Sequence, residues 1–331
     1  MLTPEDLRPY RRHAEWALVV ATAREMGLVD ALASGPRSAE GLARELSLSP
    51  RGVRILLGAL EETGFVRAEP DGRARLTGSA RAHLLDRDTP DFQGDALDLW
   101  LHNIRLWANR LPDAVRTGEP VEEEDAREIS EAEWIENFMA AMANKSPRLV
   151  ASVVDAALER VPGAGTMLDL GGGPGTFARA FVERGLEATL FDRPEVLDHV
   201  ESAYRLDGVD GLALERGDFF EEIPDGPFDV VLLANITHIF DPADDARLVE
   251  RAAGSLAPGG ILAIMDFVRG QSDFAPLFAV TMLMNTEKGD TYALSEYRRW
   301  LEEAGLEDLR CADVGEDRQL VTARRPRGGE R

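Results

Sequence analysis

The spacing of hydrophobic residues changes about half-way along the chain. In the first half they recur at helical intervals, and Ala14, Leu18 and Ala21 would share one face of a helix over residues 11–32. Beyond Val161, apolar runs of strand length alternate with helical segments, and these runs span residues 166–170, 188–191, 212–214, 228–234, 261–267 and 320–323. Strands that alternate with helices predict a parallel β-sheet with helices on both faces, so we expect an α/β fold here.

The first 85 residues show a different pattern. A short helix capped by Ser38 and a second one opened by Ser49 precede two short strands, 65–67 and 73–76, joined by a Pro-Asp-Gly turn. Helices followed by a two-stranded wing predict a winged helix, a fold whose usual function is DNA binding. Residues 1–85 hold 12 arginines against 11 acidic residues, which leaves little of the basic surface that nucleic acid requires.

The formal net charge of the whole chain is −23. This charge disfavours nucleic acid and anionic membranes as partners, because Lys and Arg must meet their phosphates. The acidic residues near the N-terminus are unlike a signal peptide, and no run of about eighteen apolar residues occurs, so we expect a cytoplasmic protein. Cys311 is the only cysteine, which excludes a disulfide within the chain.

A length of 331 residues predicts more than one domain. We expect a winged-helix domain over residues 1–90, a helical connector over 91–160, a sheet domain over 161–325 and a frayed tail over 326–331. The connector includes an acidic loop at residues 122–125.

A glycine-rich turn follows the first predicted strand of the sheet. Asp169 precedes Gly171, Gly173 and Gly175, and a helix follows. Glycines allow a tight turn and a close approach to a ligand. A dinucleotide fingerprint would require a further glycine where the chain has Thr176, which argues against a nicotinamide dehydrogenase. The turn has no Lys or Arg, which suits S-adenosylmethionine, a cofactor without phosphate whose ammonium could lie near Asp169.

Two further signals follow the next strands. Asp192 comes at the end of the second strand, where a carboxylate can accept hydrogen bonds from both ribose hydroxyls of an adenosine. Asp218 and Phe219 follow the third strand, where the carboxylate could accept from the adenine amino group and the ring could pack on the base. Together with the glycine turn, these residues predict an adenosine pocket.

These motifs resemble the bacterial and plant small-molecule O-methyltransferases typified by caffeic acid and hydroxyindole O-methyltransferases. The resemblance covers nearly the whole chain and includes Phe138-x-x-x-Met142-x-x-x-Ser146, Asp192-Arg193-Pro194, Asn235-Ile-Thr-His238, Leu256-Ala-Pro-Gly-Gly-Ile261 and Tyr297-Arg-Arg-Trp-Leu-Glu-Glu-Ala-Gly305. It implies a Rossmann-like methyltransferase domain with a mostly parallel seven-stranded sheet, preceded by a winged-helix domain through which two copies form a homodimer. It also implies a small-molecule acceptor and places Ser146 among the cofactor-binding residues.

Methyl transfer to a hydroxyl is helped by a general base, because a phenol has a pKa of about 10, and histidine is a common choice. Of the five histidines, only His238 lies just beyond the C-terminal end of a predicted sheet strand. The resemblance implies that His238 is the base and that Asp266 orients its ring. It leaves either Asp290 or Thr291 at the place of a second family acid, and Ile239 stands where relatives have an acid.

Candidate acceptor-binding residues come from the same resemblance. They are Phe138, Met142, Met282 and Asn285, and the apolar, polarizable members of this set suit a flat aromatic or polyketide-like ring. No cluster of His, Asp and Glu has the spacing of a metal site, so we expect no metal.

We therefore interpret the chain as an O-methyltransferase of secondary metabolism. Two alternatives stay open at this stage. The first keeps the fold and cofactor but transfers the methyl group to carbon, nitrogen or sulfur, or uses the bound cofactor in a non-methylating reaction. The second is a ligand-sensing transcription regulator that uses the winged helix.

Overall fold

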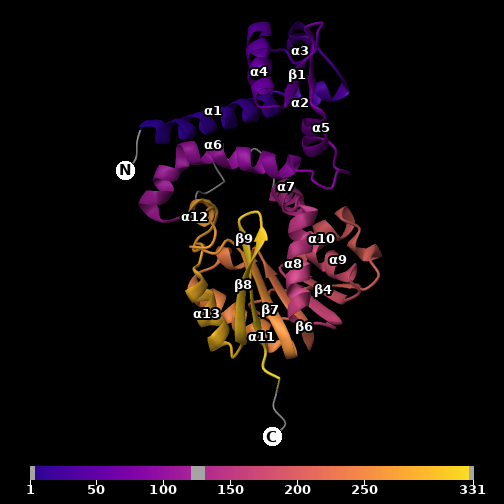
Figure 1. Ribbon diagram of the computed structural model, residues 1–331, viewed down its shortest axis with the longest axis vertical. Helices are drawn as coiled ribbons and strands as arrows, with labels where there is room; N and C mark the ends of the chain where they lie inside the picture. The colour runs from indigo at the N-terminus through magenta and orange to yellow at the C-terminus, as the bar shows by residue number, and fades with distance from the viewer. Residues whose placement is uncertain (1–3, 121–130, 328–331) are drawn as a thin grey trace. The chain divides into compact units, whose positions relative to one another are not determined.

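The computed structural model describes residues 4–120 and 131–327. It divides into two compact units, Met1–Leu106 and Trp107–Arg331 (Figure 1). The acidic loop expected at residues 122–125 and the last four residues of the expected tail lie outside the described residues.

The first unit contains the predicted helices and wing. Its elements are α1 (Pro4–Glu25), α2 (Leu28–Ala31), the 3-10 helix η1 (Leu32–Ser34), α3 (Ala39–Glu45), α4 (Pro50–Glu62), β1 (Val66–Ala68), β2 (Ala74–Leu76) and α5 (Gly78–Leu84). The Ser38 side chain caps α3 by accepting from the Gly41 N–H, and Ser49 caps α4 in the same way. β1 and β2 pair antiparallel, with Val66 opposite Leu76. The first helix ends two residues before Gly27, whose φ of 72° breaks the helical path.

The second unit holds the sheet. α6 (Gly94–Thr117) crosses the boundary between the units, and the elements after it are α7 (Glu131–Ala143), α8 (Pro147–Arg160), β3 (Thr166–Leu170), α9 (Thr176–Val182), β4 (Glu187–Asp192), α10 (Pro194–Ala203), η3 (Leu206–Gly208), β5 (Leu212–Arg216), β6 (Phe228–Ala234), η4 (Thr237–Ile239), α11 (Pro242–Gly254), β7 (Leu256–Asp266), α12 (Ala275–Asn285), α13 (Leu294–Glu303), β8 (Glu307–Gly315) and β9 (Arg318–Arg324).

The seven strands have the order β5-β4-β3-β6-β7-β9-β8. β3 to β7 are parallel to their neighbours, whereas β9 runs antiparallel to β7 and β8 antiparallel to β9. The six predicted strands and the mostly parallel seven-stranded sheet are confirmed. β8 itself corresponds to no predicted apolar run, because most of its residues are exposed and several are charged, as is common for an edge strand.

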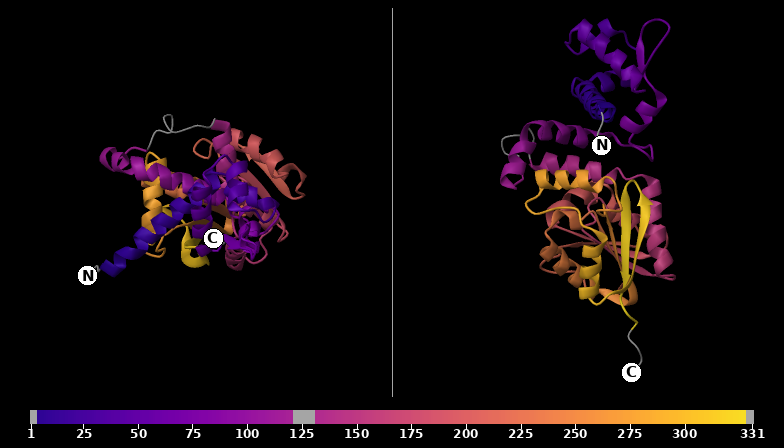
Figure 2. Two further views of the ribbon diagram at one scale, coloured as in Figure 1. Left: turned by 90° about the horizontal axis from the view of Figure 1, so that it is seen from above. Right: turned by 60° about the vertical axis from the view of Figure 1, so that its left-hand side comes forward.

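Alternate residues of the central strands face two separate cores. Met167 and Val230 pack on one side with α8, α9 and α10, while Leu168 and Val231 pack on the other with α11 and α13. The right-hand view of Figure 2 shows the sheet of this unit between these helical layers. This arrangement confirms the predicted α/β architecture and brings the carboxyl ends of five parallel strands to one edge.

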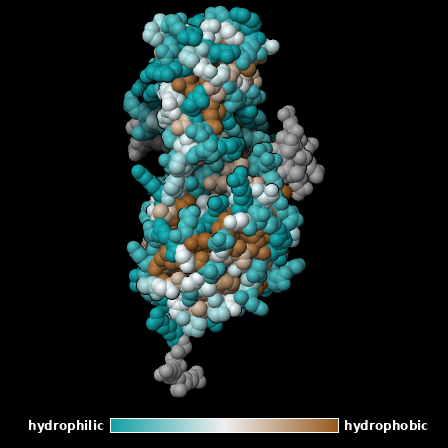
Figure 3. All heavy atoms as spheres, turned by 90° about the vertical axis from the view of Figure 1, so that its right-hand side faces the viewer, coloured by the Kyte–Doolittle hydropathy of each residue, from teal (hydrophilic) through white to brown (hydrophobic). Residues whose placement is uncertain are grey.

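The surface of the chain is mainly hydrophilic on the face drawn in Figure 3, with smaller apolar patches between the polar residues. Among the described helices, none combines the length and apolar character required to cross a membrane.

Candidate active site

The candidate site residues gather at the carboxyl edge of the parallel strands. The glycine turn follows β3, Asp192 ends β4, Asp218 follows β5, η4 follows β6 and Asp266 ends β7. Because β3 to β7 are parallel, these strand ends share one edge of the sheet. Open parallel sheets bind their ligands at such an edge.

The turn between β3 and α9 depends on its glycines. Gly171, Gly173 and Gly175 have φ angles of 69°, 51° and 73°, in the left-handed region that other residues rarely adopt. A Cβ atom on Gly171 would lie 2.6 Å from the Cδ1 atom of Ile236, so a side chain would also collide. The predicted close turn is thus present, with bare backbone where a ligand would approach.

Asp169 lies beneath this turn and is fully buried. Its Oδ2 atom accepts a hydrogen bond from the Ala178 N–H at 3.1 Å, while Oδ1 has no partner within the described residues. Burial raises the pKa of Asp169 to about 7, the Ala178 N–H opposes this shift, and the nearby Asp192 adds to it. A buried carboxyl oxygen without a partner is rare and fits a group that meets a donor or a cation from a ligand.

Asp192 connects the end of β4 to the glycine turn. Its Oδ2 accepts from the Gly173 N–H and its Oδ1 from the Arg193 N–H, both at 2.8 Å. Burial raises the pKa of Asp192, although both backbone donors act against that rise. Each carboxylate oxygen can accept a second hydrogen bond, so Asp192 can hold the turn and still accept from two hydroxyls.

Phe219 lies against the same turn. A Cβ atom on Gly171 would be 3.5 Å from its ring, and the ring packs edge-on against Phe220 and Phe240. Asp218 supports this loop, because its Oδ1 accepts from the Phe220 N–H at 2.7 Å. Ser146 caps α8 by accepting from the Leu149 N–H at 3.2 Å.

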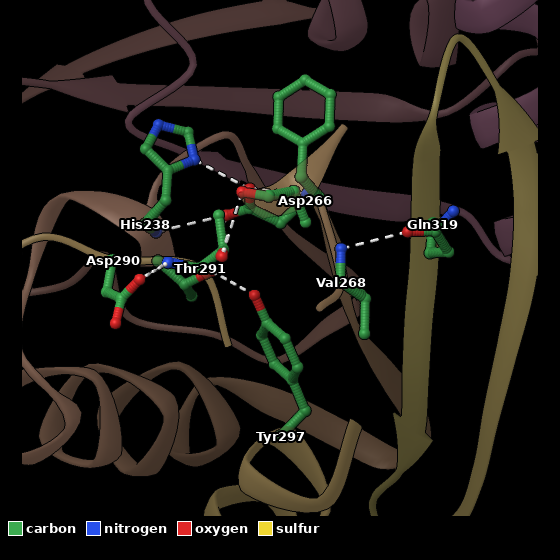
Figure 4. Close-up of polar contacts among 10 residues, drawn as sticks. His238, Asp266, Val268, Asp290, Thr291, Tyr297 and Gln319 are labelled. Carbon is green, nitrogen blue, oxygen red and sulfur yellow. Dashed lines mark hydrogen bonds and ion pairs between the residues drawn. The ribbon is translucent and has the colours of Figure 1, made fainter. Parts of the chain in front are cut away.

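His238 and Asp266 form a buried pair (Figure 4). The Nδ1 atom of His238 lies 2.8 Å from Oδ1 of Asp266, and the His238 N–H donates to Oδ2 at 3.2 Å. Two further donors reach the carboxylate: the Thr237 hydroxyl at 2.7 Å and the Phe267 N–H at 2.8 Å. The Thr237 hydroxyl also lies 3.0 Å from the Tyr297 hydroxyl, which extends the network to α13.

Asp266 is ionised in this setting. Burial alone would raise its pKa, but the His238 ring, the Thr237 hydroxyl and the Phe267 N–H together hold the pKa below its ordinary value. The carboxylate fixes the His238 ring through Nδ1. Nε2 is therefore the nitrogen available to take a proton from a ligand, and it makes no hydrogen bond among the described residues.

Two further contacts pack against His238, one on its ring and one on its backbone. The Phe278 ring of α12 packs edge-on against the imidazole, with 4.8 Å between ring centroids. The loop after α12 also packs on the His238 backbone. A Cβ atom on Gly289 would lie 2.3 Å from the His238 carbonyl oxygen, so only glycine fits at position 289. These contacts leave the His238 ring little freedom to turn.

Among the described residues, neither candidate for the second family acid forms a hydrogen bond or an ion pair with His238 (Figure 4). Asp290 accepts from the Thr291 N–H at 2.7 Å and lies 3.6 Å from Arg269, while the Thr291 hydroxyl donates to the Ala275 carbonyl. Ile239 is partly exposed at the end of η4. The structure thus supplies one acid to the histidine.

The four candidate acceptor-binding residues are placed unequally. Phe138 stacks on Trp134 with 5.0 Å between centroids, and Met142 follows one turn later on α7. Met282 is buried on α12, the helix that also carries Phe278. Asn285 is exposed and its amide donates to the Thr281 carbonyl, so it is held against its own helix. An acceptor contact by Asn285 stays a prediction.

Comparisons with known proteins match most of the chain. A model of the O-methyltransferase domain matches residues 124–307, and a model of the O-methyltransferase dimerisation domain matches residues 17–86. The chain is 30% identical to the tetracenomycin polyketide synthesis 8-O-methyl transferase TcmO of Streptomyces glaucescens, with 92% of each chain covered. The chain belongs to the O-methyltransferase family.

Further relatives agree with this assignment. The O-methyltransferase is 29% identical to the 3-hydroxy-5-methyl-1-naphthoate 3-O-methyltransferase of Streptomyces sahachiroi, with 89% of this chain and 87% of the relative covered. Its structure is similar to that of human N-acetylserotonin methyltransferase in complex with S-adenosylmethionine, with a TM-score of 0.83, 25% identity, and coverage of 98% and 100%. The predicted cofactor and the predicted O-methyltransferase activity are confirmed.

The residues of the O-methyltransferase fit this cofactor. Asp169 offers an unpartnered buried oxygen, Asp192 retains lone pairs, and the glycine turn presents bare backbone between them. Within the described residues, no group of three or more His, Cys, Asp and Glu could hold a metal ion.

Sequence reasoning missed several residues around the dyad. Thr237 and Tyr297 both stood inside the quoted motifs, but nothing in the sequence indicated that the Thr237 hydroxyl donates to Asp266 or that the Tyr297 hydroxyl meets that of Thr237. Phe278 gave no sequence signal beyond its place in an apolar helix. Such contacts join segments far apart in the sequence, so spacing alone does not disclose them.

Proposed function

We propose that this enzyme methylates a hydroxyl on an aromatic or polyketide-like metabolite, with His238 as the general base. The observation that carries the proposal is the buried His238–Asp266 pair at the carboxyl edge of the sheet, with Nε2 free of hydrogen-bond partners among the described residues. The names of the relatives describe a tetracenomycin polyketide and a hydroxynaphthoate, both of which suit an apolar pocket with one base.

The proposed chemistry is an in-line displacement. S-adenosylmethionine, when bound, supplies a methyl group on a positively charged sulfur. His238 accepts the hydroxyl proton at Nε2 as the acceptor oxygen forms its bond to carbon, and the C–S electron pair leaves with the sulfur. Asp266 keeps Nδ1–H oriented and stabilises the imidazolium that results. The Phe278 contact restricts the ring to one orientation, which favours proton transfer from a positioned hydroxyl.

The proposed cofactor roles combine the sequence expectations with the geometry of the turn. We assign Asp192 to the ribose hydroxyls, Asp218 and Phe219 to the adenine, and the backbone of Gly171, Gly173 and Gly175 to close contact with the cofactor. Asp169 and Ser146 are assigned to its amino-acid end. The support is that the turn, Asp192 and Phe219 lie together, with a Gly173–Asp192 hydrogen bond and Phe219 beside Gly171.

The acceptor pocket is assigned to the apolar residues near the dyad. Phe138, Met142 and Met282 would pack on a flat ring, and the aromatic edge of Phe278 lies beside the base.

We also propose that the enzyme is a cytoplasmic homodimer assembled through the region of residues 17–86, with neither nucleic acid nor a membrane as partner. The dimerisation-domain match and the net charge of −23 support this part of the proposal.

The test begins with a panel of hydroxyaromatic acceptors. Release of S-adenosylhomocysteine would identify an acceptor, and NMR of the product would show whether the new methyl group is on oxygen. A methyl group on carbon, nitrogen or sulfur would replace the proposed reaction with the corresponding transfer.

The role of His238 is tested by His238→Gln. We expect kcat to fall by about a hundred-fold or more, the usual contribution of a general base, with unchanged affinity for S-adenosylmethionine. The matched control is His102→Gln, because His102 is an exposed histidine of α6. Turnover within a few-fold of the wild type in His238→Gln would exclude the role.

A further inference from the structure

Lys145 has unusual surroundings for a lysine. It is one of only two lysines among the 37 basic residues of the chain, and it stands between Met142 and the α8 cap Ser146. Its ammonium is half-buried, and the nearest polar partner is the Met142 sulfur at 4.0 Å, a weak acceptor. No carboxylate bonds to it within the described residues. Burial, together with the charge of Arg318, lowers the pKa of Lys145 to about 8.

Arg318 is a second cation with incomplete partners. It begins β9, and its guanidinium lies 4.4 Å from the centroid of the Phe267 ring. Its Nη1 donates to the Glu316 carbonyl at 3.0 Å and lies 3.6 Å from the Glu316 carboxylate, while its Nε is buried without a partner. Burial lowers the pKa of Arg318, and Glu316 and Asp266 partly offset this effect.

Two packed aromatic side chains connect Arg318 to the proposed base. Phe267, under Arg318, packs against Phe278 with 4.4 Å between centroids, and Phe278 packs in turn on His238. The Lys145 ammonium lies 4.0 Å from the sulfur of Met142, a residue of the proposed acceptor pocket, and its charge also interacts with that of Arg318. Both positive charges therefore border the region where the acceptor would lie.

Two like charges in a half-buried place are unfavourable unless anions meet them, and Glu316, which lies 3.6 Å from Arg318, forms no ion pair with Lys145 among the described residues. The net charge of the chain is −23, so the protein repels anions in general and needs local cations to bind one. The planar fork of a guanidinium matches a carboxylate in particular.

We infer that Lys145 and Arg318 bind a carboxylate of the acceptor, so that the substrate is a hydroxyaryl carboxylic acid. This inference rests on the proposed function, because it names the chemical class of the molecule whose hydroxyl meets His238. Lys145 supplies a point charge with rotatable donors and Arg318 the planar fork, and the carboxylate they hold positions the hydroxyl of the same ring. In this role both are substrate-binding residues, while His238 and Asp266 carry out the proton transfer.

The test compares two probes of one shape. The affinity of 3-hydroxy-2-naphthoate and of its neutral carboxamide is measured by calorimetry in the presence of S-adenosylhomocysteine. We expect the wild-type enzyme to prefer the carboxylate by about ten-fold or more, the effect of a charge-assisted hydrogen bond. Lys145→Met should reduce the preference to within about three-fold, and Arg318→Gln should reduce it in part.

Lys288 provides the matched control. It is the other lysine of the chain, is exposed, and pairs with Asp241 and Asp244, so Lys288→Met should leave the preference unchanged. Lys145→Gln serves as a second variant if Lys145→Met melts at a lower temperature. The affinity for S-adenosylhomocysteine reports in each case whether the sheet domain is intact.

A pH series separates a charge effect from a packing effect. The groups that face Lys145 are Arg318 and Glu316, and with its pKa at about 8 the ammonium loses its proton as the pH rises above that value. The preference of the wild type for the carboxylate should therefore decline between about pH 8 and 10, whereas Lys145→Met should show no such decline.

Three results would overturn the inference: equal binding of the two probes, no binding of the carboxylate at millimolar concentration, or an unchanged preference in Lys145→Met. The proposed function fails differently. It is lost if the enzyme binds no S-adenosylhomocysteine or transfers no methyl group to any hydroxyl, while methylation of acceptors without a preference for a carboxylate would remove this inference alone.

Discussion

Asp169 and Asp266 are two buried aspartates at the same edge of one sheet, and their pKa values move in opposite directions. Among the residues that the structure describes, Asp169 has one donor and a pKa raised to about 7, whereas Asp266 has four donors and a pKa held below the ordinary value. Both are at most 1% exposed, so burial does not distinguish them. The number of donors decides which charge the fold stabilises by itself.

The difference separates two kinds of functional carboxylate. In the dyad half of the site, the donors to Asp266 all come from the protein itself: among the described residues they belong to η4 and to Phe267, the residue after β7. The cofactor half uses carboxylates with spare acceptor capacity, as the unpartnered Oδ1 of Asp169 shows. We therefore expect changes in the dyad to affect turnover and changes around the turn to affect cofactor affinity.

The largest effect is expected from Asp266→Asn. An amide cannot stabilise the imidazolium, and it can hold the wrong tautomer of His238, so kcat should fall by about a hundred- to a thousand-fold. Affinity for S-adenosylmethionine, measured by calorimetry, should stay within about two-fold. A comparable loss of cofactor affinity would show that the two halves of the site are not separate.

Asp192→Ala should affect the other half. It removes the acceptor proposed for two ribose hydroxyls and the partner of the Gly173 N–H, so the Kd for S-adenosylmethionine should rise by about a hundred-fold. At saturating cofactor, kcat should recover to within about five-fold of the wild type. NAD serves as the control ligand and should not bind to either protein. An unchanged Kd would remove Asp192 from the cofactor site.

Asp169→Asn tests the comparison of the two aspartates through the pH dependence of the free energy of unfolding. Because the folded-state pKa of Asp169 is raised to about 7, the folded protein holds the proton more tightly, and stability falls as the pH rises from about 4 to 7. Asparagine carries no such penalty, so between about pH 4 and 7 the free energy of unfolding of the variant should rise relative to that of the wild type by on the order of 4 kcal/mol. Asp266 acts in the opposite sense, since its contribution is lost as the pH falls below about 4.

A parallel loss of cofactor affinity in Asp169→Asn would connect its charge to the ligand. If affinity stays unchanged while stability rises, Asp169 supports only the turn, through the Ala178 N–H.

The sequence predicted local features of this site better than its long-range contacts. The glycine turn was predictable because alternating glycines indicate backbone positions in the left-handed region, and His238 because it lies just beyond the end of a strand of the sheet. β8 was missed because its charged, exposed residues carry no apolar pattern. Arg318 gave no signal, because its relation to Lys145 arises only when the β8–β9 hairpin folds back towards the segment after α7.

The smallest effect is expected from Thr237→Val. The change keeps the shape of the side chain but removes one of four donors to Asp266, and the other three remain: the His238 ring, the His238 N–H and the Phe267 N–H. The pKa of Asp266 should rise towards its ordinary value, and kcat should fall by about three- to ten-fold, the size of one hydrogen bond to a charged group that stays otherwise paired.

Tyr297→Phe is the matched control for that variant. It removes the hydroxyl that meets Thr237 but leaves the Thr237–Asp266 hydrogen bond intact, so kcat should change by less than in Thr237→Val. Steady-state rates across pH 5 to 9 would distinguish the two variants. The loss of a donor to the Asp266 carboxylate should shift the acid limb of the pH–rate profile in Thr237→Val alone. Equal shifts in both variants would mean that the network acts on Asp266 as one unit extending to α13, and that the dyad is not complete at the strand ends.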